Sequence, residues 1–222
     1  APGIYRETVT PKLSGTPGKP ITFRASRGGA VTIIGTDPVR KWTKHSGCIY
    51  KAKMNWSLRK NNQIFVNGKP MQEARWPNDR DMDPMTPDGM KIGGGDVDHI
   101  LCPQFPADWQ SEDLQGAVVW AIPGSAWSSW TTTISNFDPK ARKVLFPSFK
   151  GKWWVEARHN PKSRKGAFYI VGVLKLLDSP GEWFYDEAGK ILYLWAPENA
   201  DPGKLQVEAK ACRSGFDLRG LS

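Results

Sequence analysis

The N-terminal stretch, residues 3–37, constrains the fold of this chain more than any other segment. It holds three short β-branched runs, at residues 4–9, 21–25 and 31–34. Apolar and polar residues alternate within each run, and glycine and proline occupy the gaps, which predicts short strands joined by tight turns. This pattern is typical of one winding of a β-solenoid.

A comparable alternation returns at the other end of the chain, in LQVEAKACRSGFDLRGLS. A single solenoid winding cannot bury its apolar face and needs stacked neighbours. We therefore expect the strand at residues 205–209 to run parallel to one of the first three. The pattern stops at Ser222, and we expect the missing neighbour to be further sequence after it.

The same residues resemble a known family. Three phrases are similar to the first winding of right-handed parallel β-helix proteins of the pectin-lyase-like type: APGIYRETV, SGTPGKPITFRAS and VTIIGTDPV. Two more resemble a segment inserted after that winding in many bacterial members, which include glycosidases such as some β-xylosidases: QIFVNGKPMQEARWPN and DSPGEWFYDEAGKILYLWAPENADP. The resemblance implies an all-β fold, with a first β-helix winding interrupted by an inserted antiparallel β-sandwich-like domain.

The aromatic-rich middle of the chain predicts that inserted domain. Residues 63–66 and 69–75 flank Asn67-Gly68, a dipeptide that favours a type I′ hairpin turn. Further strands are predicted at residues 117–122, 130–134, 143–146, 168–177, 183–185 and 191–195. We therefore expect three parts: a first β-helix winding at 1–41, an inserted β-rich domain at 42–204, and a return to the β-helix at 205–222.

The charge of the chain favours anionic partners. Lysine and arginine number 31 against 22 aspartates and glutamates, a net charge of +9. No apolar run approaches the roughly 20 residues of a transmembrane helix, so no membrane span is predicted. Nucleic acid is not the expected partner, because the basic residues belong to no recognised nucleic-acid-binding motif.

Neither cysteine nor acidic spacing predicts a metal or cofactor site. Cys48, Cys102 and Cys212 are too few for a disulfide scaffold, and either one bridged pair or free thiols remains open. The DxDxD spacing of residues 79–83 suits calcium, but the EF-hand glycine and glutamate are missing, so we expect a solvated loop. The chain is therefore predicted to hold no metal and no cofactor.

One further cluster suits acid–base chemistry. Asp96, Asp98 and His99 come closest to a catalytic group, because two carboxylates and an imidazole lie close together in the sequence. No nucleophile signature accompanies them. We therefore expect these three residues to lie on a surface loop.

The densest mixture of basic and aromatic residues lies at positions 150–165. Indole faces stack on sugar rings, while ammonium and guanidinium groups pair with carboxylates or sulfates. These properties predict a substrate-binding surface made by Trp153, Trp154, Arg158 and Lys162. The alternative is one tryptophan in the sandwich core beside a hydrated basic loop.

The resemblance also implies a function. It makes this chain the N-terminal, non-catalytic portion of a bacterial carbohydrate-active β-helix enzyme, secreted or in the cell envelope, and a glycoside hydrolase rather than a polysaccharide lyase. Its catalytic residues would lie on later windings, beyond Ser222, and none is assigned here. The expected partner is a polysaccharide or oligosaccharide, acidic ones included. The alternative is a non-catalytic carbohydrate-binding or cell-surface interaction module on the same scaffold.

Overall fold

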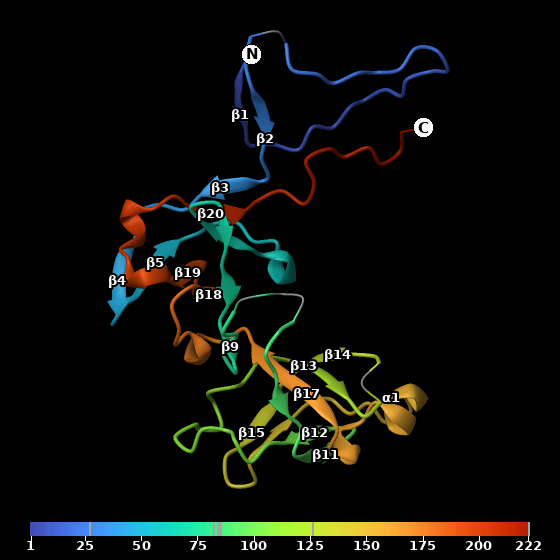
Figure 1. Ribbon diagram of the computed structural model, residues 1–222, viewed down its shortest axis with the longest axis vertical. Coiled ribbons are helices and arrows are strands. Elements are labelled where there is room, and N and C mark those ends of the chain that lie inside the picture. The colour runs from blue at the N-terminus through green and yellow to red at the C-terminus, as the bar shows by residue number, and fades with distance from the viewer. Residues whose placement is uncertain (27, 82, 84–85, 126, 222) are drawn as a thin grey trace.

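Short strands dominate the computed structural model, which describes residues 1–26, 28–81, 83, 86–125 and 127–221 (Figure 1). The prediction of an all-β chain is confirmed. The helices within these residues are one six-residue α-helix, α1 (Trp153–Arg158), and the short 3₁₀ segments η1 (Arg59–Asn61), η2 (Pro161–Ser163), η3 (Leu174–Leu176), η4 (Pro197–Asn199) and η5 (Pro202–Lys204). In the part of the chain described, no helix has the length and hydropathy needed to cross a bilayer.

Two sheets form a body that we call the first lobe. One has the strand order β4 (Thr43–Ser46), β5 (Ile49–Lys53), β19 (Ile191–Trp195), β18 (Glu182–Asp186) and β8 (Gln72–Glu73). The other has the order β3 (Thr36–Pro38), β20 (Val207–Lys210), β6 (Ile64–Val66) and β7 (Lys69–Pro70). Apolar side chains from both sheets, including those of Ile64, Leu192 and Val207, share one buried core.

Two further sheets form the second lobe, below the first in Figure 1. One has the order β10 (Met90–Lys91), β17 (Gly166–Val171), β13 (Val118–Pro123) and β14 (Trp130–Thr133), and β9 (Arg75–Trp76) also pairs with β17. The other has the order β11 (Gly94–Asp96), β12 (His99–Leu101), β16 (Lys143–Leu145) and β15 (Asn136–Asp138). Their shared core contains the fully buried rings of Phe105, Phe137 and Phe168. Burying each ring stabilises the lobe by about 1.5–3 kcal/mol.

The predicted Asn-Gly hairpin is confirmed. Strands β6 and β7 pair antiparallel around Asn67 and Gly68, whose φ angles are 51° and 77°. Both angles are positive, as a type I′ turn requires. The backbone nitrogen of Asn67 also donates to the carbonyl of Gln206, which ties the turn to the segment before β20.

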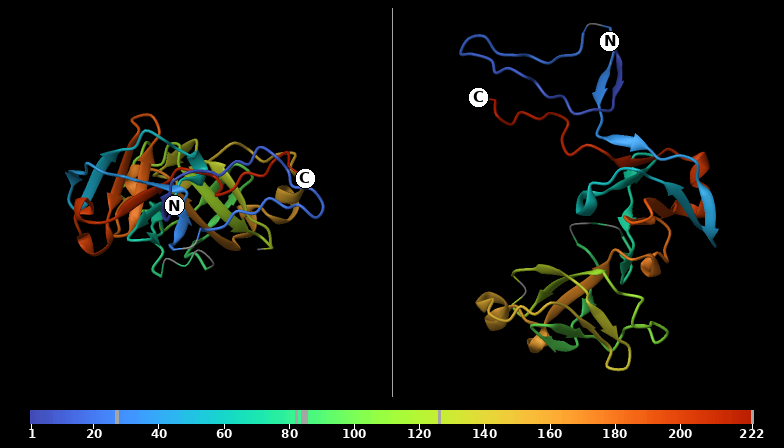
Figure 2. Two further views of the ribbon diagram at one scale, coloured as in Figure 1. Left: turned by 90° about the horizontal axis from the view of Figure 1, so that it is seen from above. Right: turned by 180° about the vertical axis from the view of Figure 1, so that it is seen from behind.

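The two ends of the chain form a terminal extension, residues 1–35 and 211–221, which projects from the first lobe (Figure 2). Strand β1 (Gly3–Tyr5) pairs parallel with β2 (Val31–Ile33), and Val9 forms an isolated parallel bridge with Phe216. Residues 21–25, predicted as a strand, lie in irregular structure. The parallel pairs therefore bring the two chain ends together over a short length.

The expected parallel β-helix is not what these sheets show. Besides the β1–β2 pair and the Val9 bridge, the described parallel pairing is that of β8 with β18, and the remaining ladders are antiparallel. The terminal extension is also mostly without regular strands. Sequence alternation predicted strand-forming runs correctly in part, but it carries no information on the direction of the partner strand.

The prediction that residues 205–209 pair parallel with an early strand is wrong. Strand β20 lies between β3 and β6 and is antiparallel to both. Its alternation places Val207 and Ala209 in the first-lobe core, together with Val39, which follows β3. These side chains are buried only if β20 turns its apolar face to the core in the correct register, and antiparallel pairing with β3 and β6 meets both conditions. The segments at 36–38 and 207–210 therefore share one core with residues from the predicted insertion.

Candidate functional site

The helix α1 lies at one edge of the second lobe and carries Trp153, Trp154 and Arg158, whereas Lys162 lies in η2, which follows it (Figure 1). Val155 anchors the helix because its side chain is fully buried. At the C-terminal end, the carbonyl of Arg158 accepts a hydrogen bond from the backbone nitrogen of Ser125 at 3.0 Å. Gly124 makes this approach possible: its φ is +66°, and a Cβ there would lie 1.9 Å from the Arg158 carbonyl oxygen. The short helix is therefore fixed from both sides.

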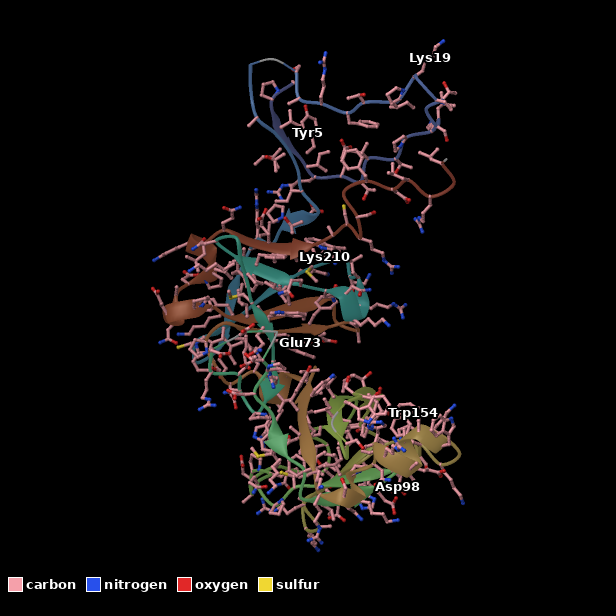
Figure 3. The ribbon with its side chains drawn as sticks, turned by 45° about the vertical axis from the view of Figure 1, so that its right-hand side comes forward. Tyr5, Lys19, Glu73, Asp98, Trp154 and Lys210 are labelled. Carbon is pink, nitrogen blue, oxygen red and sulfur yellow. The ribbon has the colours of Figure 1, made fainter. Side chains whose placement is uncertain are left out.

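The two consecutive tryptophans of α1 have different surroundings. Trp153 is 75% exposed, whereas Trp154 is partly buried and packs against the second-lobe core. Figure 3 shows Trp154 at this edge of the lobe. Neighbouring residues of a helix point in different directions, so only one of the two indoles offers an open face.

A third tryptophan, which the sequence analysis did not select, lies nearby. Trp127 is 69% exposed, and its ring centroid is 4.8 Å from that of His159. The His159 ring is also 6.2 Å from Trp154. The neighbourhood of Trp127 in the sequence, WSSW, carries no cation and therefore gave no signal. We call Trp127, Trp153, Arg158 and Lys162, with exposed Lys150 and Lys152, the α1 surface.

The cations of the α1 surface are not equivalent. Arg158 is exposed, and its backbone carbonyl, not its guanidinium, accepts the hydrogen bond from Ser125. Lys162 forms an ion pair with Asp96, with 3.1 Å between Nζ and Oδ2. The hydrogen bond from Lys162 holds the pKa of the Asp96 carboxyl below the usual range of an aspartate. Arg158 is thus the freer partner for an anionic ligand.

The acidic candidates of the sequence have mostly internal partners. Asp98 contacts His99 at 2.6 Å between Oδ1 and Nδ1, and Asp96 pairs with Lys162. Asp79 is buried against Arg75, while Asp81 and Asp83 are exposed. Within the described residues, no three histidine, cysteine or acidic side chains are grouped to hold a metal ion. Cys48, Cys102 and Cys212 are all free thiols.

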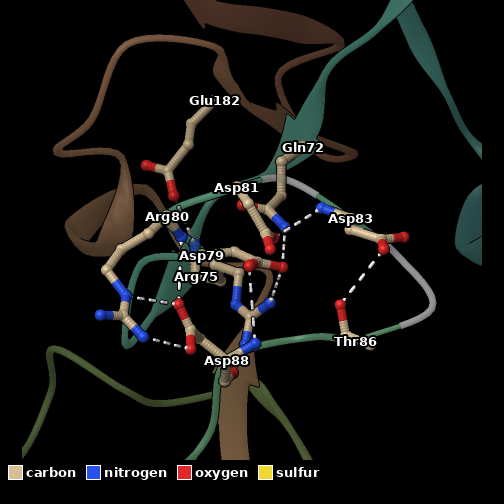
Figure 4. A network of polar contacts seen from close by, with 9 residues as sticks. All are labelled: Gln72, Arg75, Asp79, Arg80, Asp81, Asp83, Thr86, Asp88 and Glu182. Carbon is tan, nitrogen blue, oxygen red and sulfur yellow. Dashed lines mark hydrogen bonds and ion pairs between the residues drawn. The ribbon is translucent and has the colours of Figure 1, made fainter.

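A buried charge network joins the two lobes (Figure 4). Arg75 in β9 forms an ion pair with Asp79 at 2.9 Å, and their side chains are only 3% and 1% exposed. The guanidinium also lies over the Tyr169 ring, 4.2 Å from its centroid, and donates to the carbonyl of Asp88. Gln72 in β8 donates to the same Asp79 carboxylate at 3.1 Å. The network therefore links a first-lobe strand to the outer face of a second-lobe sheet.

Glu182 lies beside this network and is 2% exposed. Its carboxyl accepts hydrogen bonds from the backbone nitrogens of Asp178 and Ser179, each at 3.2 Å, and from that of Arg75 at 3.4 Å. Burial raises the pKa of Glu182 to about 8, because ionisation in this site loses solvation. Spacing in the sequence gave no sign of this, because the burial of Glu182 and its contact with Arg75 arise only in the folded chain.

The likeness of this chain to known proteins lies in structure and not in sequence. No protein-family model and no curated protein matches the chain. A solved structure named "Glycoside hydrolase" matches 100% of this chain and 39% of its own, with a TM-score of 0.74 and 18% identity. Another, named "The complex structure of XylC with xylose", matches 97% of this chain and 26% of its own, with a TM-score of 0.43 and 15% identity. The chain thus shares the fold of a part of the first structure and spans 39% of its length.

Proposed function

We propose that this chain is the N-terminal, non-catalytic portion of a secreted or cell-envelope carbohydrate-active protein of the β-helix type, a glycoside hydrolase rather than a lyase. The likeness of fold to part of a structure named "Glycoside hydrolase" supports this. So do the parallel pairs of the terminal extension. In this proposal, the chain holds polysaccharide and the catalytic residues lie on further β-helix windings.

The terminal extension supports the β-helix part of the proposal in a second way. It exposes apolar side chains around a groove of ≈ 760 Å³, lined by Leu13, Ile21, Phe23, Phe216 and Leu218 among others. A contiguous exposed apolar surface usually marks a surface that is covered by another element. Successive β-helix windings present apolar side chains of this kind to one another.

The observation that carries carbohydrate binding is the exposure of Trp153 and Trp127 beside cationic side chains. Trp153 is 75% exposed and Trp127 is 69% exposed, and large exposed apolar surface bordered by polar residues marks interaction sites. An indole face takes the apolar face of a sugar ring, and Arg158 pairs with a carboxylate or sulfate. The α1 surface thus suits an acidic polysaccharide.

Truncating the exposed indole is expected to weaken this binding. Trp153→Ala should reduce affinity for an acidic polysaccharide such as polygalacturonate roughly two- to tenfold, because an aromatic contact contributes about 0.5–1.5 kcal/mol beyond its area. The Arg158→Ala/Lys162→Ala variant should weaken binding at low salt and have less effect at high salt, since salt screens exposed charges. Isothermal titration calorimetry at both salt concentrations measures these changes.

The control is Lys44→Ala/Lys204→Ala, which removes the same charge from exposed positions of the first lobe. It should leave affinity nearly unchanged. Equal losses from both double variants would show that net charge alone binds the polysaccharide, and would contradict the α1 surface as a site. Release of sugar products by this chain would contradict the non-catalytic assignment.

A further inference from the structure

A cleft of ≈ 1070 Å³ separates the two lobes at the place where the chain crosses between them. Its first-lobe side is lined by η1 residues Arg59 and Lys60 and by Tyr185 and Glu187. Figure 3 shows Glu73, another lining residue, near the junction of the lobes. The volume accommodates several sugar rings, since ligand pockets commonly measure about 300–1,000 Å³.

The second-lobe side of the cleft is the outer face of a sheet. In the register of β14, β13 and β17, Thr133, Val118 and Val171 lie side by side in one row. The next row on that face places Thr131 beside Trp120 and Tyr169, whose rings stack at 4.9 Å. In the first row, Thr133 offers a hydroxyl group beside the methyl groups of Val118 and Val171, at strand spacings of about 5 Å. Such a surface can take both the hydroxyl groups and the C–H faces of a sugar chain.

Glu73 is the last residue of β8, where the chain crosses from the first lobe to β9 in the second. Its neighbour Ala74 accepts a hydrogen bond from Gly172 and donates one to Trp183, so the crossing segment is held by both lobes. A Cβ on Gly172 would lie 3.3 Å from the Glu73 Oε1, which places the carboxylate against the other crossing segment. Burial raises the pKa of Glu73.

The carboxylate of Glu73 lacks donors of its own. Among the described residues, no hydrogen bond or ion pair reaches it, whereas Glu187 accepts one from Ser57. A half-buried carboxylate without donors loses free energy of solvation that a bound hydroxyl group restores. Glu73 also lines an adjoining hollow of ≈ 260 Å³ with Gln72, Arg75 and Tyr169. The acceptor therefore stands where two hollows meet.

The charges of the lining select the class of ligand. Arg59 and Lys60 contribute two positive charges, and Glu73 and Glu187 contribute two negative charges, so the formal charges sum to zero. An anionic chain would meet the unpartnered Glu73 carboxylate inside the cleft, and like charges repel there more strongly than at an exposed surface. A neutral chain rich in hydroxyl groups avoids this repulsion and supplies the missing donors.

We infer that the interlobe cleft is a second carbohydrate site, one that binds a neutral oligosaccharide through hydroxyl groups that donate hydrogen bonds to Glu73 and through contact with the row formed by Thr133, Val118 and Val171. Its choice of ligand class rests on the proposed function, but its residues are separate from those of the α1 surface. The two sites therefore differ in ligand charge: the α1 surface takes acidic chains, and the cleft takes neutral ones.

The test titrates the ¹⁵N-labelled chain with neutral tetra- to hexasaccharides of xylan, cellulose and mannan. At least one of them should shift the amide resonances of residues 131–133 and 172 in a saturable way. Glu73→Gln should weaken that ligand roughly tenfold, because hydrogen bonds to a charged acceptor contribute more than those to a neutral one. Thr133→Trp, which fills the cleft from its other side, should weaken it at least as much.

Two controls separate this site from the α1 surface and from misfolding. Glu112→Gln, at an exposed position outside the cleft, should bind as the parent does. Trp153→Ala/Arg158→Ala should lose acidic polysaccharide and keep the neutral oligosaccharide, while Glu73→Gln should do the reverse. Glu73→Gln should not lower the melting temperature. The raised pKa of Glu73 means that its ionised form is less favourable in the folded chain than in the unfolded chain, and the substitution removes that charge.

Three results would overturn the inference. The first is the absence of saturable shifts in the cleft with every neutral oligosaccharide. The second is binding that Glu73→Gln and Thr133→Trp leave unchanged. The third is loss of neutral and acidic ligands together in Trp153→Ala/Arg158→Ala, which would assign both ligands to the α1 surface.

Discussion

Arg75→Met is expected to lower the free energy of unfolding by about 3–5 kcal/mol, because it leaves the Asp79 carboxylate buried without its cation. Both side chains of the pair are 3% exposed or less. Among the described residues, the remaining side-chain donor to Asp79 is Gln72, at 3.1 Å. The substitution also removes the guanidinium from the Tyr169 ring. Urea unfolding, with both lobes followed by tryptophan fluorescence, measures the loss.

Arg80→Met provides the matched control five positions along the same chain segment. Arg80 pairs with Asp88 at 2.9 Å, and its side chain is 87% exposed. Its hydrogen bond lowers the pKa of Asp88 to about 2, yet exposed pairs contribute little to the free energy of unfolding, because solvent screens the two charges. The double variant Arg75→Met/Asp79→Leu should recover much of the lost stability, because both buried charges are then gone. Equal effects of Arg75→Met and Arg80→Met would contradict this account of the network.

Stability is expected to fall as pH rises from about 5 to 8, owing to Glu182. Burial raises the pKa of this carboxyl from 4.5 to about 8. Between these values the folded chain holds a proton that the unfolded chain has released, so unfolding is favoured by higher pH, and the loss levels off above about 8. Where the folded chain binds one proton more than the unfolded chain, the free energy of unfolding falls by about 1.4 kcal/mol per pH unit. Glu182→Gln, which cannot ionise, should remove most of this slope.

The measurement is the free energy of unfolding at half-unit pH intervals for the parent, Glu182→Gln and Glu112→Gln. Glu112 is exposed, so its variant should follow the parent. The pKa values of Asp88 and Asp217 are each lowered to about 2 by an arginine, and both groups finish titrating below this pH window. A parallel pH slope in the parent and Glu182→Gln would show that Glu182 is ionised in the folded chain.

Local patterns in the sequence predicted the elements whose conformation depends on near neighbours. The Asn67-Gly68 turn is one case, because positive φ angles are a property of those two residues. The strands β13, β14, β16, β18 and β19 are others, since their apolar alternation or β-branched content is itself the signal. The all-β class followed from many such runs.

The sequence also located part of the α1 surface. Trp153 was identified by its density of neighbouring cations, and the structure places it in solvent. Trp127 was missed because its neighbours in the sequence are small and uncharged, and it approaches α1 through His159. The sequence pattern did not predict the helix α1, and it did not decide which of Trp153 and Trp154 is exposed, because that depends on which face of the helix packs against the second-lobe core.

Tertiary structure alone decided the direction and partners of β20, the burial of Arg75 and Asp79, and the raised pKa of Glu182. Alternation states which faces are apolar, but strand direction is fixed by which neighbour completes the core, and β3 and β6 do so from opposite sides. A pKa depends on solvation and on donors, and those of Glu182 come from Arg75, Asp178 and Ser179. The sequence by itself determined an all-β chain with its local turns, because those depend on adjacent residues. The interlobe cleft and its unpartnered Glu73 arise from residues far apart in the chain, which only folding brings together.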